Sequence, residues 1–135
     1  MELGPWHHVS LSVRDLDASI GWYRDVLGFE VAVDEPPAEG RRAVIMRFGG
    51  DGTLALGLVQ HGAGGQPFDV TATGLDHAAF HVDSAEDMAA WAARLDDHGV
   101  AHSGAIEIPP GAILNFKDPD GIALALFWVR GAAPE

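Results

Sequence analysis

The sequence predicts an α+β fold built from two tandem β-α-β-β-β units. The first observation behind this prediction is an internal repeat at a spacing of about 69 residues, in which the stretch from His8 to Val13 returns as the stretch from His77 to Val82. The second is that strand-like alternation and helix-like spacing follow in the same order in both copies. Such a duplication predicts two similar units whose matched positions face a shared interior.

The first unit is predicted at about residues 6–61. Apolar and polar residues alternate over residues 6–13, as in a half-buried strand. Apolar residues then fall at helical spacing from Asp15 to Leu27, and Gly28 is a natural stop for that helix. Three more strands are predicted to complete the unit, at residues 29–34, 41–48 and 53–61.

The second unit is predicted at about residues 74–129, after a linker at about residues 62–73 that starts with a Gly-rich stretch. Residues 75–82 resemble a strand, and Ser84 to Asp87 resembles a capping box that opens a helix ending at Gly99. Strands are predicted at about residues 103–108, 112–117 and 122–129. Both units together are expected to form one domain over residues 1–135.

Strand phase predicts which residues lie on the face of each sheet away from the helix. If Val9, Leu11 and Val13 pack on the helix, the residues between them face the other way. In the second unit the same rule turns Ala78, Phe80 and Val82 inward. The opposite face then carries His8, Ser10 and Ser12 in the first unit and His77, Ala79 and His81 in the second, a polar and small-residue pattern typical of a pocket.

The composition excludes several classes of partner. A formal charge of −12 opposes binding to phosphate backbones, so no nucleic-acid partner is expected. No apolar run approaches the roughly 20 residues that span a bilayer, so no membrane association is expected. The chain has no Cys and no secretory signal at its start, which favours a cytoplasmic protein without disulfides or thiolate chemistry.

Several motifs resemble the two modules of the vicinal oxygen chelate superfamily, which includes glyoxalases, extradiol dioxygenases and bleomycin-resistance proteins. The first module is similar at His8 and from Val13 to Phe29, and the second at Gly74 to His77 and Phe116 to Gly121. The resemblance covers roughly residues 6–129. It implies paired modules that form a U-shaped, mostly antiparallel sheet around a small-molecule pocket, with the helices on the outer face.

The resemblance also implies where a divalent metal ion would bind. Metal-dependent members hold the ion at the ends of the first and last strands of each module, and His8 and His77 match the first-strand ligand positions. The last-strand positions, where the family usually has a carboxylate, fall at or near Gly57 and at Ala125. Two imidazoles alone make a weak site, so a metal would need an unusual third ligand, for which the candidates are His61, His81 and Glu107.

A site without metal is the alternative. His8, His77 or His81 could then act as a general acid or base. Aromatic residues, including Trp6 and Trp128, could form walls for a flat ligand, and Arg47 could pair with an anionic group. The predicted ligand-binding residues are Ser10, Ser12, Arg47, Phe48, Gly57, Ala79, Asn115, Phe116, Ala125 and Phe127.

Three functions remain open from the sequence. The first is a binding protein that holds an antibiotic or another small organic molecule in the paired-module pocket, as bleomycin-resistance-like relatives do. The second is a metal-dependent isomerase, lyase or dioxygenase that uses His8 and His77. The third is a metal-free enzyme with a His acid or base. From the resemblance we also expect a homodimer.

Overall fold

The computed structural model describes residues 1–49 and 54–131, which divide into two compact units, Met1–Pro67 and Phe68–Glu135. The division falls inside the stretch that the sequence marks as a linker. Thr53, the predicted first residue of the fourth strand, lies outside the described residues. None of the helices in the described part of the chain is long and apolar enough to cross a membrane.

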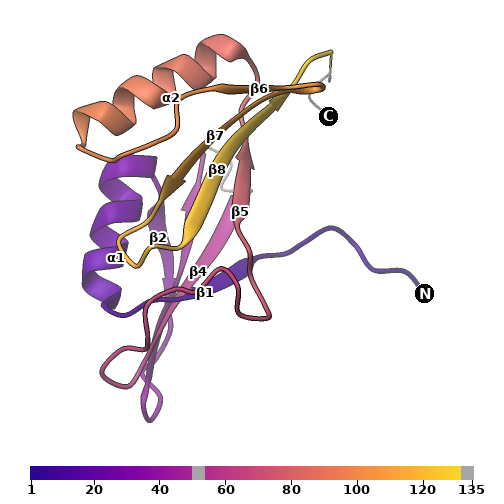
Figure 1. The fold of residues 1–135 in the computed structure, drawn as a ribbon. Coiled ribbons are helices and arrows are strands. Elements are labelled where there is room, and N and C mark those ends of the chain that lie inside the picture. The colour runs from indigo at the N-terminus through magenta and orange to yellow at the C-terminus, as the bar shows by residue number, and fades with distance from the viewer. Residues whose placement is uncertain (50–53, 132–135) are drawn as a thin grey trace. The chain divides into compact units, whose positions relative to one another are not determined.

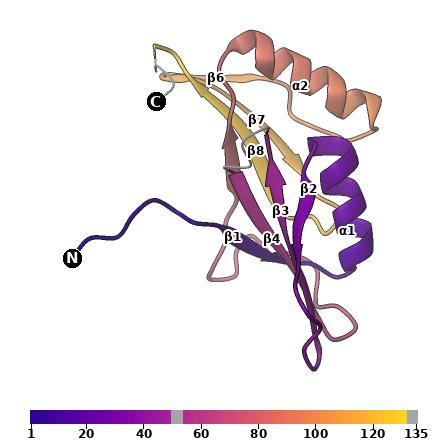
Figure 2. The same ribbon diagram turned by 180° about the vertical axis from the view of Figure 1, so that it is seen from behind.

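Unit 1 is a four-stranded sheet with its helix on one face (Figures 1 and 2). Its strands follow the order β1-β4-β3-β2, in which β1 and β4 run parallel and the other pairs run antiparallel. The elements are β1 (Val9–Ser12), α1 (Leu16–Trp22), the π-helical turn η1 (Tyr23–Leu27), β2 (Glu30–Asp34), β3 (Arg41–Phe48) and β4 (Leu54–His61).

Unit 2 repeats this topology. Its strands follow the order β5-β8-β7-β6, again with a parallel pair, β5 and β8, formed by the first and last strands. The elements are β5 (Ala78–His81), α2 (Ala85–Asp97), β6 (Ile106–Ile108), β7 (Gly111–Lys117) and β8 (Ala123–Val129). The predicted α+β class with two β-α-β-β-β modules is therefore confirmed.

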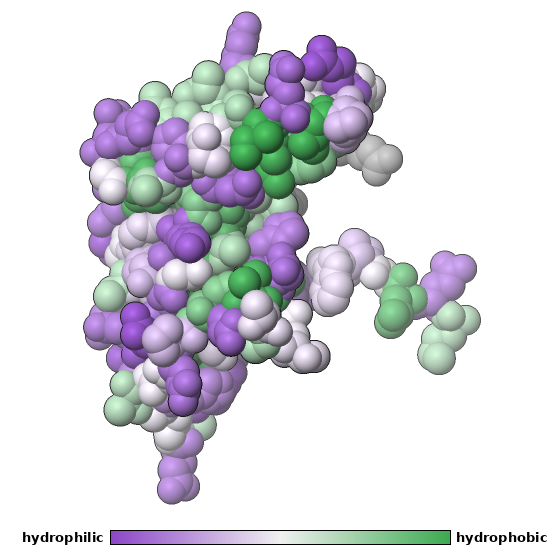
Figure 3. All heavy atoms as spheres, viewed as in Figure 1, coloured by the Kyte–Doolittle hydropathy of each residue, from purple (hydrophilic) through white to green (hydrophobic). Residues whose placement is uncertain are grey.

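The first strand of each unit is shorter than the sequence pattern predicts. Alternation runs over residues 6–13 and 75–82, but β1 spans only Val9–Ser12 and β5 only Ala78–His81. Alternation shows which side chains can face a core, whereas a strand also needs a hydrogen-bonded neighbour. The residues before Val9 extend away from the sheet, and Leu3 and Trp6 on them are exposed (Figures 1 and 3).

The predicted helix from Asp15 to Leu27 is two segments in the structure. The α-helix ends at Trp22 and the chain continues as a π-helical turn, which ends at Gly28 with a φ of 86°. Tyr23, Val26 and Leu27 keep the i, i+3 and i+4 spacing of one helical face through this turn, and all three are buried, at 0%, 4% and 3% exposure.

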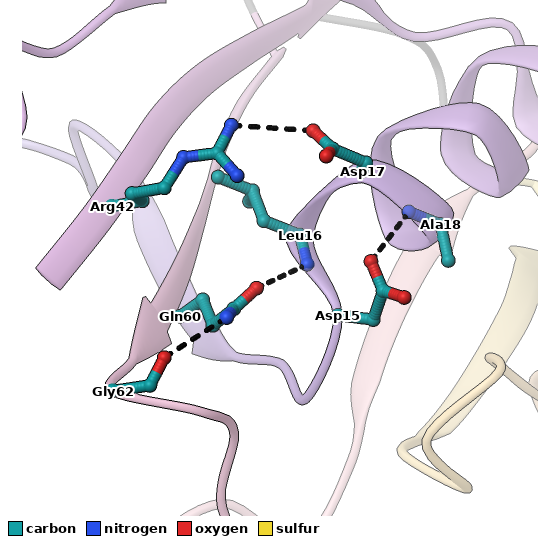
Figure 4. A network of polar contacts seen from close by, with 7 residues as sticks. All are labelled: Asp15, Leu16, Asp17, Ala18, Arg42, Gln60 and Gly62. Atoms are coloured by element: carbon teal, nitrogen blue, oxygen red, sulfur yellow. Dashed lines mark hydrogen bonds and ion pairs between the residues drawn. The ribbon is translucent and has the colours of Figure 1, made fainter.

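A polar network fastens the start of α1 to the end of β4 (Figure 4). The side-chain oxygen of Gln60 accepts a hydrogen bond from the backbone N–H of Leu16 at 2.8 Å, and its amide nitrogen donates to the carbonyl of Gly62 at 3.0 Å. Asp15 caps the helix by accepting from the N–H of Ala18 at 3.1 Å. The first-turn N–H groups of a helix lack partners within the helix, so this network supplies two of them.

One face of each sheet is apolar and is covered by the helix. In unit 1 the row Leu11, Leu58 and Val44 is buried, and α1 packs against β4. In unit 2 the corresponding face is also buried, and α2 packs against β7 and β8 through Met88 and Leu95. The other face, which we call the open face of each unit, carries the side chains that alternate with these rows.

Candidate functional site

The register of unit 1 places three residues side by side at the centre of its open face. Ser10 on β1 pairs with Gly57 on β4, and Gly57 pairs with Ile45 on β3. His8 precedes the first pair, Val9 with Leu56, by one residue. It therefore lies directly before β1, one residue outside the paired strand, and its place on the face of Ser10 and Ser12 stays a prediction.

The register of unit 2 gives the matching positions without ambiguity. Ala79 on β5 pairs with Ala125 on β8, which pairs with Asn115 on β7. Because Ser10 and Ala79 occupy the same place in the repeat, Gly57 and Ala125 are equivalent. The alignment that is loose by about one residue in the sequence is thus settled by strand pairing.

The register also changes one pair of equivalent residues. The sequence repeat matches Arg47 with Asn115, but the residue of unit 1 that is level with Gly57 is Ile45. Arg47 is level with Ala55, two residues from Gly57 along β4, and the residue with that place in unit 2 is Lys117, level with Ala123. Each open face therefore carries one cation in the row nearest its opening histidine.

Phe48 and Phe116 do not lie on the open faces. Phe48 follows Arg47 along β3 and so turns to the helix side, where its ring packs 5.4 Å from the ring of Phe29. Phe116 follows Asn115 in the same way and is buried at 4% exposure. Of the predicted aromatic ligand contacts, Phe127 stays on the open face, where it pairs with His81 and is half-buried.

Gly57 has no room for a side chain. A Cβ built on Gly57 would overlap the hydroxyl oxygen of Ser10 and lie 2.9 Å from the Cβ of Ser10. The Ser10 side chain thus occupies the space from which a side chain at position 57 would start. Ala125 is fully buried at 0% exposure, beside the methyl group of Ala79.

In each unit the residue before the opening histidine contacts its Nδ1 atom. In unit 1 the Nδ1 atoms of His7 and His8 are 2.8 Å apart, so one ring donates to the other. In unit 2 the Nδ1 of His77 is 2.7 Å from a carboxylate oxygen of Asp76. An ionised carboxylate only accepts, so the proton is on Nδ1 of His77 and Nε2 keeps its lone pair in the neutral ring.

His81 is held by a second carboxylate. Its Nε2 lies 3.3 Å from a carboxylate oxygen of Asp83, which favours the proton on Nε2 and leaves Nδ1 as the acceptor. Across the described residues, neither Nε2 of His77 nor Nδ1 of His81 has a hydrogen-bond partner. The side chains of His77 and His81 are 50% and 55% exposed, so both free nitrogens are open to a ligand.

The candidate third metal ligands are placed apart from the opening histidines of their own units. His61 lies four residues beyond Gly57 on β4, roughly 13 Å along the strand, and on the side of Gly57 away from His8. His81 is four residues from His77 on β5. Glu107 pairs with Ala112, which pairs with Trp128, and this row is on the helix side of the sheet.

His102 contributes a support that the sequence did not single out as functional. Its ring, whose side chain is only 13% exposed, donates from Nε2 to Asp96 at 2.9 Å and accepts at Nδ1 from the N–H of Gly104 at 2.9 Å. The adjacent Ser103 exchanges hydrogen bonds with the backbone of Asn115. The loop before β6 is thereby fixed against the strand that presents Asn115. The sequence around this loop does not reveal the support, because Asp96 comes from α2 and Asn115 from β7.

The duplicated fold and the two opening histidines define a family, and the comparison with known families agrees. The profile of the Glyoxalase/Bleomycin resistance protein/Dioxygenase superfamily matches residues 6–126. The chain belongs to this superfamily.

Individual relatives cover much of the chain but differ in what they do. A glyoxylase/bleomycin resistance protein/dioxygenase domain from Frankia sp. EAN1pec is 37% identical, with a TM-score of 0.88 over 96% of this chain and 100% of that one. TnmS3, an antibiotic binding protein from Streptomyces sp. CB03234, is 26% identical, with a TM-score of 0.72 over 96% of this chain and 98% of its own.

A curated relative is much longer. The "Putative ring-cleaving dioxygenase MhqA" of Bacillus subtilis (strain 168) is 27% identical over 125 residues. These make up 92% of this chain but only 38% of that protein, so this chain spans well under half of the relative's length.

Members of the superfamily often use divalent metal ions, and the residues of this chain do not fit such an ion in the usual way. Neither β4 nor β8 carries an Asp or a Glu, and Ser10 occupies the space next to Gly57. Among residues 1–49 and 54–131, no group of three or more His, Asp or Glu side chains is placed to hold a metal ion. A divalent ion normally takes at least three protein ligands or several oxygens, and the opening histidines alone do not supply such a set.

Proposed function

We propose that this protein binds a small organic molecule on the open faces of its sheets, through side chains and without the metal centre of its metal-dependent relatives. The observation that carries the proposal is the pair of positions Gly57 and Ala125, where the expected carboxylates are replaced. At Gly57 the space is also occupied, because the Ser10 side chain lies where the Cβ of a metal-ligating side chain would be.

The open faces have the chemistry of a binding surface. Apolar and small side chains such as Ile45, Ala79 and Phe127 alternate with a few polar groups, among them Ser10 and Asn115, which is the usual composition of a small-molecule site. The similarity to the antibiotic binding protein TnmS3 over nearly the whole chain supports this proposal. The acidic surface favours a neutral or cationic ligand over an anionic one.

The test is ligand-induced stabilisation in the absence of metal. The purified protein is treated with EDTA, analysed for residual metal, and heated with a panel of polycyclic aromatic antibiotics. A ligand present at 100 times its dissociation constant stabilises the native state by about 2.7 kcal/mol, which raises the melting temperature measurably.

His77→Ala should reduce this stabilisation, whereas His98→Ala, at the exposed C-terminal cap of α2, should leave it unchanged. The proposal fails if ligands stabilise the protein only after Mn²⁺, Ni²⁺ or Zn²⁺ is restored. It also fails if a stoichiometric metal survives purification and is lost in His77→Ala.

A metal-free enzyme is the second candidate, and one observation favours it. The hydrogen bond from Nδ1 of His77 to Asp76 orients the ring and leaves Nε2 able to take a proton from a bound hydroxyl. Mass spectrometry of each stabilising ligand after incubation separates the two functions. Unchanged ligand supports binding alone, and a converted ligand whose conversion is lost in His77→Ala supports the enzyme.

The oligomeric state remains a prediction from the family. A homodimer would approximately double the mass of the 14.3 kDa chain in light scattering.

A further inference from the structure

Two histidines held by carboxylates mark the two ends of β5. His77 comes directly before the strand and His81 is its last residue, so His77, Ala79 and His81 share the open face of unit 2. We call these three residues the β5 strip. At about 3.3 Å per residue, the two histidines are roughly 13 Å apart along it.

Each histidine of the β5 strip presents an acceptor nitrogen to solvent. The hydrogen bond to Asp76 fixes Nε2 of His77 as an acceptor, and the contact with Asp83 favours Nδ1 of His81 in the same role. The two carboxylates leave the local charge negative. A ligand group that meets either nitrogen must therefore be a donor, and it gains nothing from being an anion.

The middle of the β5 strip is low and apolar. Ala79 is exposed and offers only a methyl group, and its neighbour in register, Ala125, is fully buried and adds no side chain above it. Phe127 stands beside His81 and adds a half-buried ring at that end. A flat, rigid ligand can lie over such a surface between two polar ends. Small-molecule sites usually combine an apolar lining with a few polar groups that fix the ligand's orientation.

We propose that the β5 strip binds an elongated, flat molecule with a hydrogen-bond donor at each end, one for Nε2 of His77 and one for Nδ1 of His81. This inference rests on the proposed function and deepens it, because it names the ligand class: a rigid aromatic molecule with terminal hydroxyl or N–H groups about one strip length apart. Unit 1 lacks the second imidazole, since the residue in the place of His81 is Ser12, whose short hydroxyl can donate as well as accept.

Three stilbene probes test the donor requirement. The first has a para-hydroxyl group on each ring, the second has one such hydroxyl, and the third has both hydroxyls methylated. Dissociation constants are measured by calorimetry on the full chain, with EDTA, at a pH where the ¹⁵N signals show neutral imidazole rings. Labelling of histidine with ¹³C and ¹⁵N reports which rings the probe touches and which nitrogen of each carries the proton.

The expected order of affinity is dihydroxy, then monohydroxy, then dimethoxy, with each donor giving about a two- to tenfold gain, the range for one neutral hydrogen bond. His77→Ala and His81→Ala should each remove one such factor for the dihydroxy probe and leave the dimethoxy probe unchanged. Both residues are exposed, so their removal leaves the core intact. The matched control, His98→Ala, should change nothing.

Asp76→Ala keeps the His77 ring and tests its orientation. The ¹⁵N signals should show Nδ1 protonated in the natural protein and a mixture of tautomers in the variant, together with a smaller loss of affinity for the dihydroxy probe. A purely structural role for Asp76 would change neither the tautomer nor the probe affinity.

The inference is overturned if the dimethoxy probe binds as tightly as the dihydroxy probe, or if the dihydroxy probe does not bind. It is also overturned if the ring signals that shift belong to histidines other than His77 and His81. Should the antibiotic panel stabilise the metal-free protein while the stilbenes fail, the β5 strip alone is rejected. If neither set of molecules binds, the proposed function is rejected as well.

Discussion

The two units share one topology but differ at the centre of their open faces. In unit 1, Ser10 lies against Gly57, and its side chain fills the space that a Cβ at position 57 would need. In unit 2, Ala79 lies against Ala125, so both strands keep a methyl group. The backbone pairing is the same in both units. The difference is that in unit 1 the side chain on the first strand fills the space between the two strands, whereas in unit 2 each strand contributes a methyl group.

The two positions where the family resemblance implies a carboxylate are therefore occupied in two physically distinct ways. At Gly57 the neighbouring strand compensates for the missing side chain, so a return to a larger residue meets a clash. At Ala125 a side chain still starts from the backbone, but it is buried at 0% exposure, and a charge there would lose its hydration. Three predictions test how far the two units differ.

The largest expected effect is at Gly57. Gly57→Ala should destabilise the protein by about 1–3 kcal/mol, because the new methyl group overlaps the side chain of Ser10. Ser10→Ala combined with Gly57→Ala should recover part of that loss, since it removes the hydroxyl but leaves a Cβ 2.9 Å away.

Urea denaturation of the four proteins in this double-mutant cycle measures the coupling between positions 10 and 57. The matched change in unit 2, Ala125→Gly, should cost about 1 kcal/mol through lost packing and added chain entropy. If Gly57→Ala is no more destabilising than Ala125→Gly, the proposed contrast between the two centres is wrong.

Substitutions at the starts of the two helices should show a smaller difference in stability between the units than those at positions 57 and 125. Gln60→Leu removes the acceptor of the partly buried Leu16 N–H, and we expect a loss of about 1–2 kcal/mol in denaturant unfolding. Gln60→Glu should retain only part of the stability, since it keeps an acceptor oxygen near the N-terminus of a helix but replaces the donor to the Gly62 carbonyl with a second acceptor.

In unit 2 the equivalent support is local, because Ser84 accepts from the N–H of Asp87 at 3.0 Å. Ser84→Ala should cost about 1 kcal/mol. Equal stability of Gln60→Leu and the natural protein would show that the long-range hydrogen bond in unit 1 contributes nothing.

The smallest effect concerns the segments that precede the first strands. The segment of unit 2 contains a turn in which the Thr71 hydroxyl, at 2.6 Å, and then the Thr71 backbone N–H, at 2.9 Å, donate to Asp69 and lower the pKa of that carboxyl. A lowered folded-state pKa stabilises the turn above the unfolded-state pKa, and this stabilisation is lost as pH falls through the folded value.

Thr71→Val should raise the pKa of Asp69 towards its ordinary value, though only partly, because the backbone donor remains. Thr71→Ser should leave the pKa nearly unchanged. An NMR titration of the Asp69 carboxyl carbon measures both, and an unaltered pKa in Thr71→Val would contradict the assigned cause.

The order of elements was predictable because it depends on local patterns. Periodicity, the Ser84 cap and the stop at Gly28 each have a local physical cause, and the structure confirms the helix stop and the cap. The break between α1 and η1 at Trp22 was missed, because the buried side chains keep helical spacing across it and the sequence pattern shows no interruption. The strand ends of β1 and β5 were missed because they depend on where a neighbour stops pairing.

The site was less predictable, because it depends on register. The sequence repeat found His8 and His77 but matched Arg47 with Asn115. The strand registers of the two units instead make Arg47 equivalent to Lys117. Phe48 and Phe116 were named as ligand contacts because they are aromatic, although they follow Arg47 and Asn115 directly and adjacent residues of a strand face opposite sides of its sheet. The contacts of His77 and His81 with Asp76 and Asp83 were within reach of the sequence, because each pair is one or two residues apart.

The parallel pairing of the first and last strands has a consequence for how each unit is made. β4 and β8 leave the ribosome last within their units, yet each becomes an inner strand between two earlier ones. A nascent unit therefore holds its opening strand without a partner until the final hairpin is complete, and its closure depends on contacts that are distant in sequence. A ribosome stalled before residue 54 should carry a first unit still sensitive to protease, and one stalled far enough past His61 to expose β4 should carry a resistant one.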